Sequence, residues 1–279
     1  MLNVRSMSHG DIEFAVHLAN TMDWNLAPED FEFAMELEPR GCFILLYNLE
    51  KIGIVTTVRF GKMGWFGNLI VNERYREKGG GTMLASHAVK YLKGKKVETI
   101  GLYAYTHRVP FYRRLGFEYD SDFIVLKGKG VSSPENPHMK KAEREDIKKV
   151  IAYDRSCLGV LRRKLLEPIL LDGDNICYLC VEDGKIAGYI IAKVYRGMSE
   201  VGPLVCRQEC SETALDLLRA TINRLAGFEA TMCVHEKQTA LLELLKRRGF
   251  SESFRVARMF HGPKIDTDCI YIAESLERG

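Results

Sequence analysis

The stretch Val71-Asn-Glu-Arg-Tyr-Arg-Glu-Lys-Gly-Gly-Gly-Thr82 joins an apolar run, typical of a strand, to a segment with helical periodicity. Backbone N–H groups at such a turn, and at the start of the helix that follows, point at one spot and bind anions. Glycines leave the backbone open to close approach by a phosphate. We interpret the stretch as a phosphate-binding loop, and the alternative is a glycine-rich connector without a ligand. It matches neither a Walker loop nor a dinucleotide fingerprint.

The same order of segments occurs twice along the chain. Residues 42–71 and 177–206 each contain three apolar runs of strand length separated by turn residues. Each is followed by a helical pattern, a short strand and a helix that ends in Gly-Phe. The spacing from Gly67 to Gly116 is nearly that from Gly202 to Gly249. The sequence therefore predicts an internal duplication.

A linker is expected between the two copies. Residues 127–138 are rich in Gly, Pro and Ser, which is typical of a connecting segment. We place the boundary near residue 132, which gives a first domain of residues 1–131 and a second of residues 132–279.

The glycine-rich loop resembles a known family signature. Arg76-x-x-Gly79-x-Gly81 matches the acyl-CoA signature of the GNAT superfamily, Gln/Arg-x-x-Gly-x-Gly/Ala, and the preceding run matches that family's fourth strand. The resemblance implies an α/β (α+β) fold of two tandem GNAT-like domains, each with a mixed, mostly antiparallel twisted sheet flanked by helices. It implies acetyl-CoA as co-substrate and no metal. A bulge in the fourth strand would open a slot for the thioester. The residues implied to bind acetyl-CoA are Leu69, Ile70, Val71, Arg76, Lys78, Gly79, Gly80, Gly81 and Thr82.

Tyr112 is the candidate catalytic residue. It lies in Phe111-Tyr-Arg-Arg-Leu-Gly-Phe117, which resembles the late helix of the same family, where a tyrosine commonly protonates the departing thiolate. A positioned phenol can donate this proton as the thiolate forms. The alternative is an aromatic side chain packed on the sheet. The segment 106–110 lacks the Asn that many members of the family have before this tyrosine.

The second copy is predicted to lack the cofactor chemistry. Alignment on Gly-Phe puts Leu245 at the position of Tyr112, and alignment on the earlier glycines puts Ser211, Ala214 and Asp216 at the positions of Arg76, Gly79 and Gly81. Its other stretches resemble the C-terminal module of YitH-type acetyltransferases: 154–162, 201–205 and 258–262. We expect this half to wall the acceptor site or to form a dimer contact.

The acceptor side of the site is less well marked. Trp24, Asn25 and Trp65 are candidates for lining a substrate pocket, although tryptophan is often a packing residue. The predicted fourth strand offers no acid as general base. Water relayed to Glu36, Glu38 or His107 is the remaining candidate.

Composition sets the remaining bounds. The 279 residues are 46% hydrophobic and 28% charged, with a net charge of +3, which gives no strong signal for nucleic acid or membrane binding. The polar start and the absence of a long apolar stretch predict a cytoplasmic protein. Of eight cysteines, Cys177 and Cys180 form a C-x-x-C, but residues three apart on a strand face opposite ways, which disfavours a shared metal.

The resemblance implies an N-acetyltransferase that moves an acetyl group from acetyl-CoA to a primary amine by direct transfer in a ternary complex. The expected partners are a small-molecule amine or peptide amine as acceptor, which the sequence does not identify further, and a second copy of the chain in a homodimer. Two other classes stay open: a non-catalytic acyl-CoA sensor, against which Tyr112 argues, and an interaction protein with a vestigial fold, against which the glycines argue.

Overall fold

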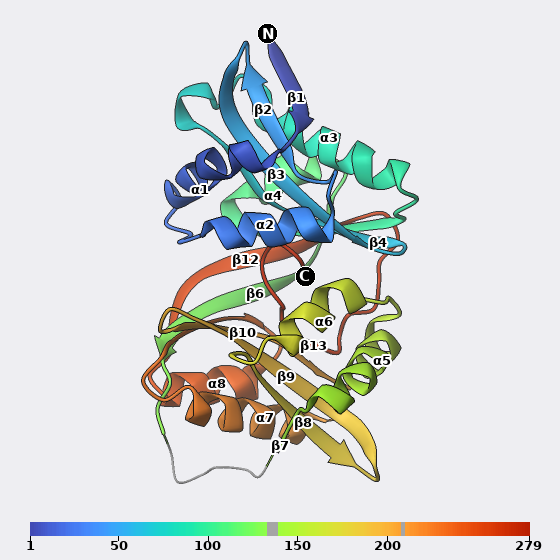
Figure 1. Ribbon diagram of the computed structural model, residues 1–279, viewed down its shortest axis with the longest axis vertical. Coiled ribbons are helices and arrows are strands. Elements are labelled where there is room, and N and C mark those ends of the chain that lie inside the picture. Colours follow the sequence, from blue (N-terminus) through green and yellow to red (C-terminus); the bar gives the residue numbers. More distant parts are fainter. Residues whose placement is uncertain (133–138, 208–209) are drawn as a thin grey trace.

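The computed structural model describes residues 1–132, 139–207 and 210–279. Within these residues, thirteen strands form one continuous sheet, and helices cover both of its faces (Figure 1). The strand order is β1-β2-β3-β4-β5-β12-β6-β11-β13-β10-β9-β8-β7. Neighbouring strands are mostly antiparallel, with parallel pairs at β4–β5 and β10–β11.

Each half contributes a similar series of elements. The first comprises β1 (Leu2–Ser6), α1 (Ile12–Asn20), α2 (Pro28–Leu37), β2 (Phe43–Tyr47), β3 (Glu50–Phe60), β4 (Met63–Val71), α3 (Gly80–Gly94), β5 (Thr99–Tyr105), α4 (Val109–Arg113) and β6 (Glu118–Lys129). The second comprises β7 (Lys140–Lys141), α5 (Ile147–Leu158), α6 (Arg163–Leu171), β8 (Ile176–Glu182), β9 (Lys185–Tyr195), β10 (Met198–Cys206), α7 (Ser211–Arg224), β11 (Glu229–His235), α8 (Thr239–Arg247), β12 (Ser251–His261) and β13 (Ile270–Ile272). The predicted duplication is confirmed.

The two halves exchange their long late strands. β12 lies between β5 and β6, with Met259 opposite Leu102, and β6 continues the ladder to β11, with Leu126 opposite Met232. Residues 127–129, which the sequence suggested as linker, are the end of β6, while residues 133–138 lie outside the described part of the chain. A division at residue 132 stays a prediction. Strands from the two sides of this boundary are joined by backbone hydrogen bonds, as in the pairs β5–β12, β6–β12 and β6–β11.

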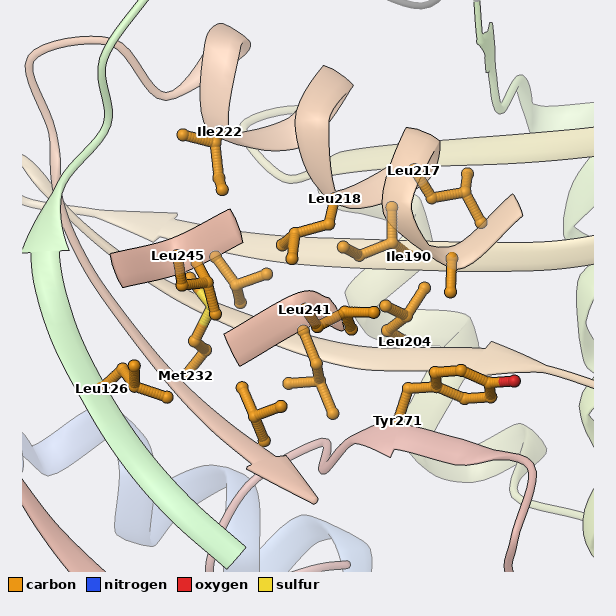
Figure 2. Packing of buried hydrophobic residues seen from close by; sticks show 14 of the residues in the cluster. Leu126, Ile190, Leu204, Leu217, Leu218, Ile222, Met232, Leu241, Leu245 and Tyr271 are labelled. Atoms are coloured by element: carbon orange, nitrogen blue, oxygen red, sulfur yellow. The ribbon is translucent and has the colours of Figure 1, made fainter. Parts of the chain in front are cut away.

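Periodic apolar positions account for the helices. On one face of the first half, Leu84, Ala88 and Leu92 of α3 are fully buried, as their helical spacing predicted. Helices α1 and α2 cover the opposite face through a separate cluster. Figure 2 shows the equivalent layer of the second half, where Leu217, Leu218 and Ile222 of α7 and Leu241 and Leu245 of α8 pack over strands. Leu126 of β6 joins this cluster, so the strand exchange also joins the cores.

The cysteines are free thiols, and the C-x-x-C pair divides as expected. Cys177 packs with the α5–α6 cluster, whereas Cys180 lies against the α7 cluster on the other face. Among the described residues, no group of three His, Cys, Asp or Glu side chains is arranged to hold a metal ion. In the same part of the chain, no helix combines the length and apolarity needed to cross a bilayer.

Candidate active site

A slot opens between β4 and β5. The two strands pair in parallel only at Met63–Thr99, Gly64–Ile100 and Trp65–Gly101 and then separate. On its other side, β4 shifts register against β3 between Ile54 and Thr56, and Asn68 adopts a left-handed φ of 51°. The expected bulge in the fourth strand is therefore confirmed. It leaves main-chain groups of residues 68–71 facing the slot without a strand partner on that side.

The loop from β4 into α3 has the geometry of an anion site. Asn72 Oδ1 accepts a hydrogen bond from Arg74 N at 3.1 Å, and Arg76 Nε donates to Val71 O at 3.2 Å, which fixes the turn. Gly79 has a left-handed φ of 80° and precedes the helix. A Cβ at Gly79 would meet nothing within 4 Å, so its surface is open. The first N–H groups of a helix have no carbonyl partner within it, and they suit a diphosphate.

Tyr112 lies on α4 beside the slot. Its ring packs against the rings of Phe111, Phe66 and Phe117, at centroid distances of 5.0, 6.0 and 6.0 Å. Burial raises the pKa of Tyr112, against a smaller lowering by the charge of Arg108, so the phenol stays protonated at neutral pH. Its hydroxyl makes no hydrogen bond to the described residues, which leaves the proton free to be donated.

One cavity of about 1570 Å³ brings most of the predicted site together. It extends from the loop before α3, past the slot and Tyr112, to β10 and β11 of the second half. The predicted residues that line it are Trp24, Asn25, Leu69, Ile70, Val71, Arg76, Gly79, Gly81, Thr82 and Tyr112.

Three predicted site residues lie elsewhere. Trp65 is 2% exposed and stacks on Tyr103 at 5.3 Å, so it is a core residue and the predicted acceptor contact is wrong. Lys78 Nζ lies 5.1 Å from the centroid of the Tyr75 ring and 5.7 Å from that of Tyr47, outside the cavity lining. Gly80 faces Leu45, where an added Cβ would come within 2.8 Å, so this glycine serves helix packing.

The loop between α1 and α2, which carries the predicted acceptor residues Trp24 and Asn25, lines the cavity. Trp24 Nε1 donates to Tyr105 Oη at 2.9 Å, which ties this loop to the end of β5. The suggested base Glu38 is instead held by Arg59 at 3.3 Å and Lys164 at 3.0 Å, and it is buried. Glu36 and His107 also lie outside the cavity lining.

The second half has a matching slot that is filled by the chain itself. β10 and β11 pair at residues 198–201 and 229–232, and then β13 inserts between them, with Ile272 opposite both Leu204 and Val234. A Cβ at Gly202 would lie 1.9 Å from Ala273 O, so glycine is required where the inserted chain crosses β10. This half holds a strand of its own where β4 and β5 leave an open slot.

The same backbone hydrogen bond closes the late helix in each half. Phe117 N donates to Tyr112 O at 3.1 Å, and Phe250 N donates to Leu245 O at 2.9 Å. The predicted equivalence of Tyr112 and Leu245 is therefore confirmed, and Leu245 is fully buried.

The alignment on Gly67 and Gly202, which predicted Ser211, Ala214 and Asp216 as the counterparts of Arg76, Gly79 and Gly81, is wrong. Ser211, Ala214 and Asp216 lie within α7, not in a loop. The link from β10 to α7 (207–210) is shorter than the link from β4 to α3 (72–79), and it contains no glycine.

The structure adds a segment that carried no sequence signal. Residues 273–279 follow β13 and return to the first half, where an added Cβ at Gly67 would lie 2.6 Å from Glu277 Cα. Leu276, Glu277 and Arg278 line the cavity beside β4. No local pattern marks these residues, because their role depends on a contact with a strand two hundred residues earlier in the chain.

An open slot beside a bulged strand, followed by a glycine turn into a helix, defines the GNAT class of fold and site. Residues 13–117 match the family model described as "Acetyltransferase (GNAT) family", and residues 150–272 match the model "Acetyltransferase (GNAT) domain". The chain is therefore a tandem protein of the GNAT superfamily, a family of acyltransferases. No curated protein shows significant sequence similarity to it.

Solved structures agree with the tandem fold. A candidate acetyltransferase from Pyrococcus horikoshii has a TM-score of 0.82 at 23% identity, covering 100% of this chain and 96% of the other. A GCN5-related N-acetyltransferase from Sphaerobacter thermophilus has a TM-score of 0.67 at 14% identity, covering 96% and 98%. A tandem GNAT protein from the clavulanic acid biosynthesis pathway has a TM-score of 0.64 at 13% identity, covering 95% and 100%.

Proposed function

We propose that the chain is an N-acetyltransferase that transfers the acetyl group of acetyl-CoA to a primary amine within a ternary complex. The observation that carries this proposal is the continuity of one cavity from the loop before α3, through the slot at the β4 bulge, to Tyr112. Acceptor-side residues, including Trp24, line the same cavity. We further propose that residues 1–131 hold the cofactor and that the second half walls the acceptor site.

Each part of the site has a role in this reaction. Main-chain N–H groups at the start of α3 would hold the diphosphate, and Arg76 would hold the loop against the end of β4. The unpaired edge of β4 at residues 68–71 would bind the pantetheine arm as an added strand and polarise the thioester carbonyl. Tyr112 would protonate the thiolate as the C–S bond breaks. Holding both reactants together lowers the barrier further.

Acetyl-CoA binding is tested by the exchange Gly81→Asp. A Cβ at Gly81 meets only Phe111, at an ordinary 3.6 Å, so aspartate fits there. In the first turn of a helix aspartate is stabilising, but it sets a carboxylate against the diphosphate. We expect the melting temperature of the free protein to be kept or raised and the thermal shift caused by acetyl-CoA to be lost. Acetyl-CoA at 100 times its Kd should stabilise the wild type by about 2.7 kcal/mol.

Gly81→Ala is the matched control. It adds the same Cβ without charge and should keep most of the thermal shift. An undiminished shift in Gly81→Asp would place the diphosphate elsewhere. Release of thiol from acetyl-CoA in the presence of an amine panel then separates an enzyme from a sensor, because a sensor binds acetyl-CoA and releases no thiol above the rate without amine.

A further inference from the structure

Glu277 is fixed at the acyl end of the slot by an ordered turn. Ser275 Oγ accepts hydrogen bonds from Glu277 N at 3.3 Å and from Arg278 N at 3.1 Å. The backbone at Glu277 passes directly over Gly67, where any side chain on β4 would collide with it. Gly67 precedes the bulged residue Asn68, so Glu277 lies next to the stretch of β4 where the thioester would sit.

The neighbouring charges are already paired with one another. Lys193 Nζ lies 2.6 Å from Glu274 Oε1 and 2.7 Å from Glu200 Oε2, and Arg278 Nε donates to Glu274 Oε2 at 3.0 Å. Within the described residues, the carboxylate of Glu277 makes no hydrogen bond or ion pair. It is therefore the one carboxylate of this group left to meet a ligand in the cavity.

The surroundings of Glu277 favour an exchange of a proton with a bound group. Burial raises the pKa of Glu277, and the charges of Glu200 and Glu274 add to the effect, against Arg278 and Lys193. A carboxylate with a raised pKa is a stronger base than one in water.

On one side of this carboxylate lie the paired charges described above, and the other side of the cavity is apolar and aromatic. The guanidinium of Arg278 lies over the ring of Phe33, 5.5 Å from its centroid, and donates to Glu274. On the apolar side, Leu276 packs in one cluster with Tyr103, Tyr105 and Phe254, and Trp24 Nε1 donates to Tyr105 Oη. One unpaired carboxylate among such groups suits a ligand with a single cationic amine on an apolar body.

We propose that Glu277 is the general base of the reaction and that the acceptor is a monoamine with an apolar or aromatic body. This inference rests on the proposed acetyl transfer. Glu277 takes one proton from the ammonium group, and the amine nitrogen forms a bond to the acetyl carbon. The C–S bond breaks, and Tyr112 gives its proton to the sulfur and recovers one from the nitrogen. The products are the N-acetyl amine, coenzyme A as the thiol, and one proton that leaves from Glu277.

The experiment measures thiol release by the full chain with 2-phenylethylamine, spermidine and glucosamine as acceptors. We expect kcat/KM for 2-phenylethylamine to exceed that for either polar amine by at least about tenfold, because its phenyl ring would remove apolar surface of the pocket from water and a polar amine would not. Glu277→Gln should lower kcat by about 10²- to 10⁴-fold at neutral pH. Its Kd for acetyl-CoA should stay within about twofold, because Glu277 would contact the acceptor.

The pH profile separates a base from a merely structural residue. A base acts when deprotonated, so the wild-type rate should rise with pH through the pKa of Glu277 and then level off. The rate of the Gln variant should lack this step and should keep rising with pH until the acceptor in solution has changed from its ammonium form to the free amine. Glu212→Gln, on the exposed first turn of α7, is the control and should match the wild type.

Each outcome bears on a different claim. If the wild type does not bind acetyl-CoA, the proposed function itself fails. If it binds acetyl-CoA and Glu277→Gln retains a third or more of the wild-type rate, the general base is wrong while the transferase assignment stands. If spermidine or glucosamine is the better acceptor, or none of the three amines is acetylated, the proposed acceptor class is overturned.

Discussion

Replacing Tyr112 with phenylalanine is expected to lower kcat for acetyl transfer by about 10²- to 10⁴-fold, the usual contribution of a positioned acid. The exchange removes one hydroxyl and keeps the ring, which packs between Phe66, Phe111 and Phe117. Acetyl-CoA should therefore bind as before, and the melting temperature should change little. Steady-state thiol release, with an independent measurement of acetyl-CoA affinity, gives both quantities.

The leaving group provides a sharper check on this role. A less basic thiolate needs less help from an acid, so the variant should recover part of its rate with an acyl thioester whose thiol has a lower pKa. Phe111→Leu, on the same helix, is the control for disturbed packing and should not show this selective recovery. A Tyr112→Phe enzyme with the wild-type kcat would exclude the tyrosine as the proton donor.

Removing the carboxylate of Asp154 is expected to destabilise the fold by about 3–5 kcal/mol, because it leaves a buried charge without its partner. Asp154 and Arg162 are 0% and 3% exposed, and Arg162 Nη2 lies 2.7 Å from Asp154 Oδ1. Tyr189 Oη donates to the same carboxylate at 2.6 Å, and Arg162 Nη1 donates to the Gly279 carbonyl oxygen at 2.8 Å. The pair thus joins α5, β9 and the segment that crosses β4.

The midpoint of urea unfolding for Asp154→Ala measures this cost. Replacing both charges, in Asp154→Leu with Arg162→Met, should restore a large part of the stability, because no unpaired charge then remains. Arg163→Met removes an exposed arginine next to Arg162 and serves as the control, since its ion pair with Glu167 is largely exposed. A loss below about 1 kcal/mol in Asp154→Ala would show that Arg162 finds water or another partner.

Local features of the fold could be read from the sequence. The glycine loop and the apolar spacing of Leu84, Ala88 and Leu92 depend on neighbours a few residues away, and both are found in the structure. Stretches that resembled the C-terminal module also have structural explanations. Gly202 makes room for Ala273, and Arg258 forms a buried ion pair with Asp120 at 2.7 Å.

What the sequence could not supply depends on distant contacts. Trp65 looked like a pocket residue, but Tyr103 and the segment ending at Gly279 bury it. Glu277 gave no signal, because its position is set by a crossing over Gly67. The exchange of β6 and β12 was equally hidden, since a strand has the same apolar pattern whichever partner it joins.

The exchange of late strands has a consequence for the nascent chain. One edge of β5 pairs with β4, and the other edge has no partner until β12 is available. The first sheet therefore stays incomplete until residue 261 has left the ribosome. During that interval β5 and β6 expose unpaired edges, which favour aggregation and recruit chaperones. The first half therefore matures only after nearly the whole of this sequence has been translated, although its own residues emerge first.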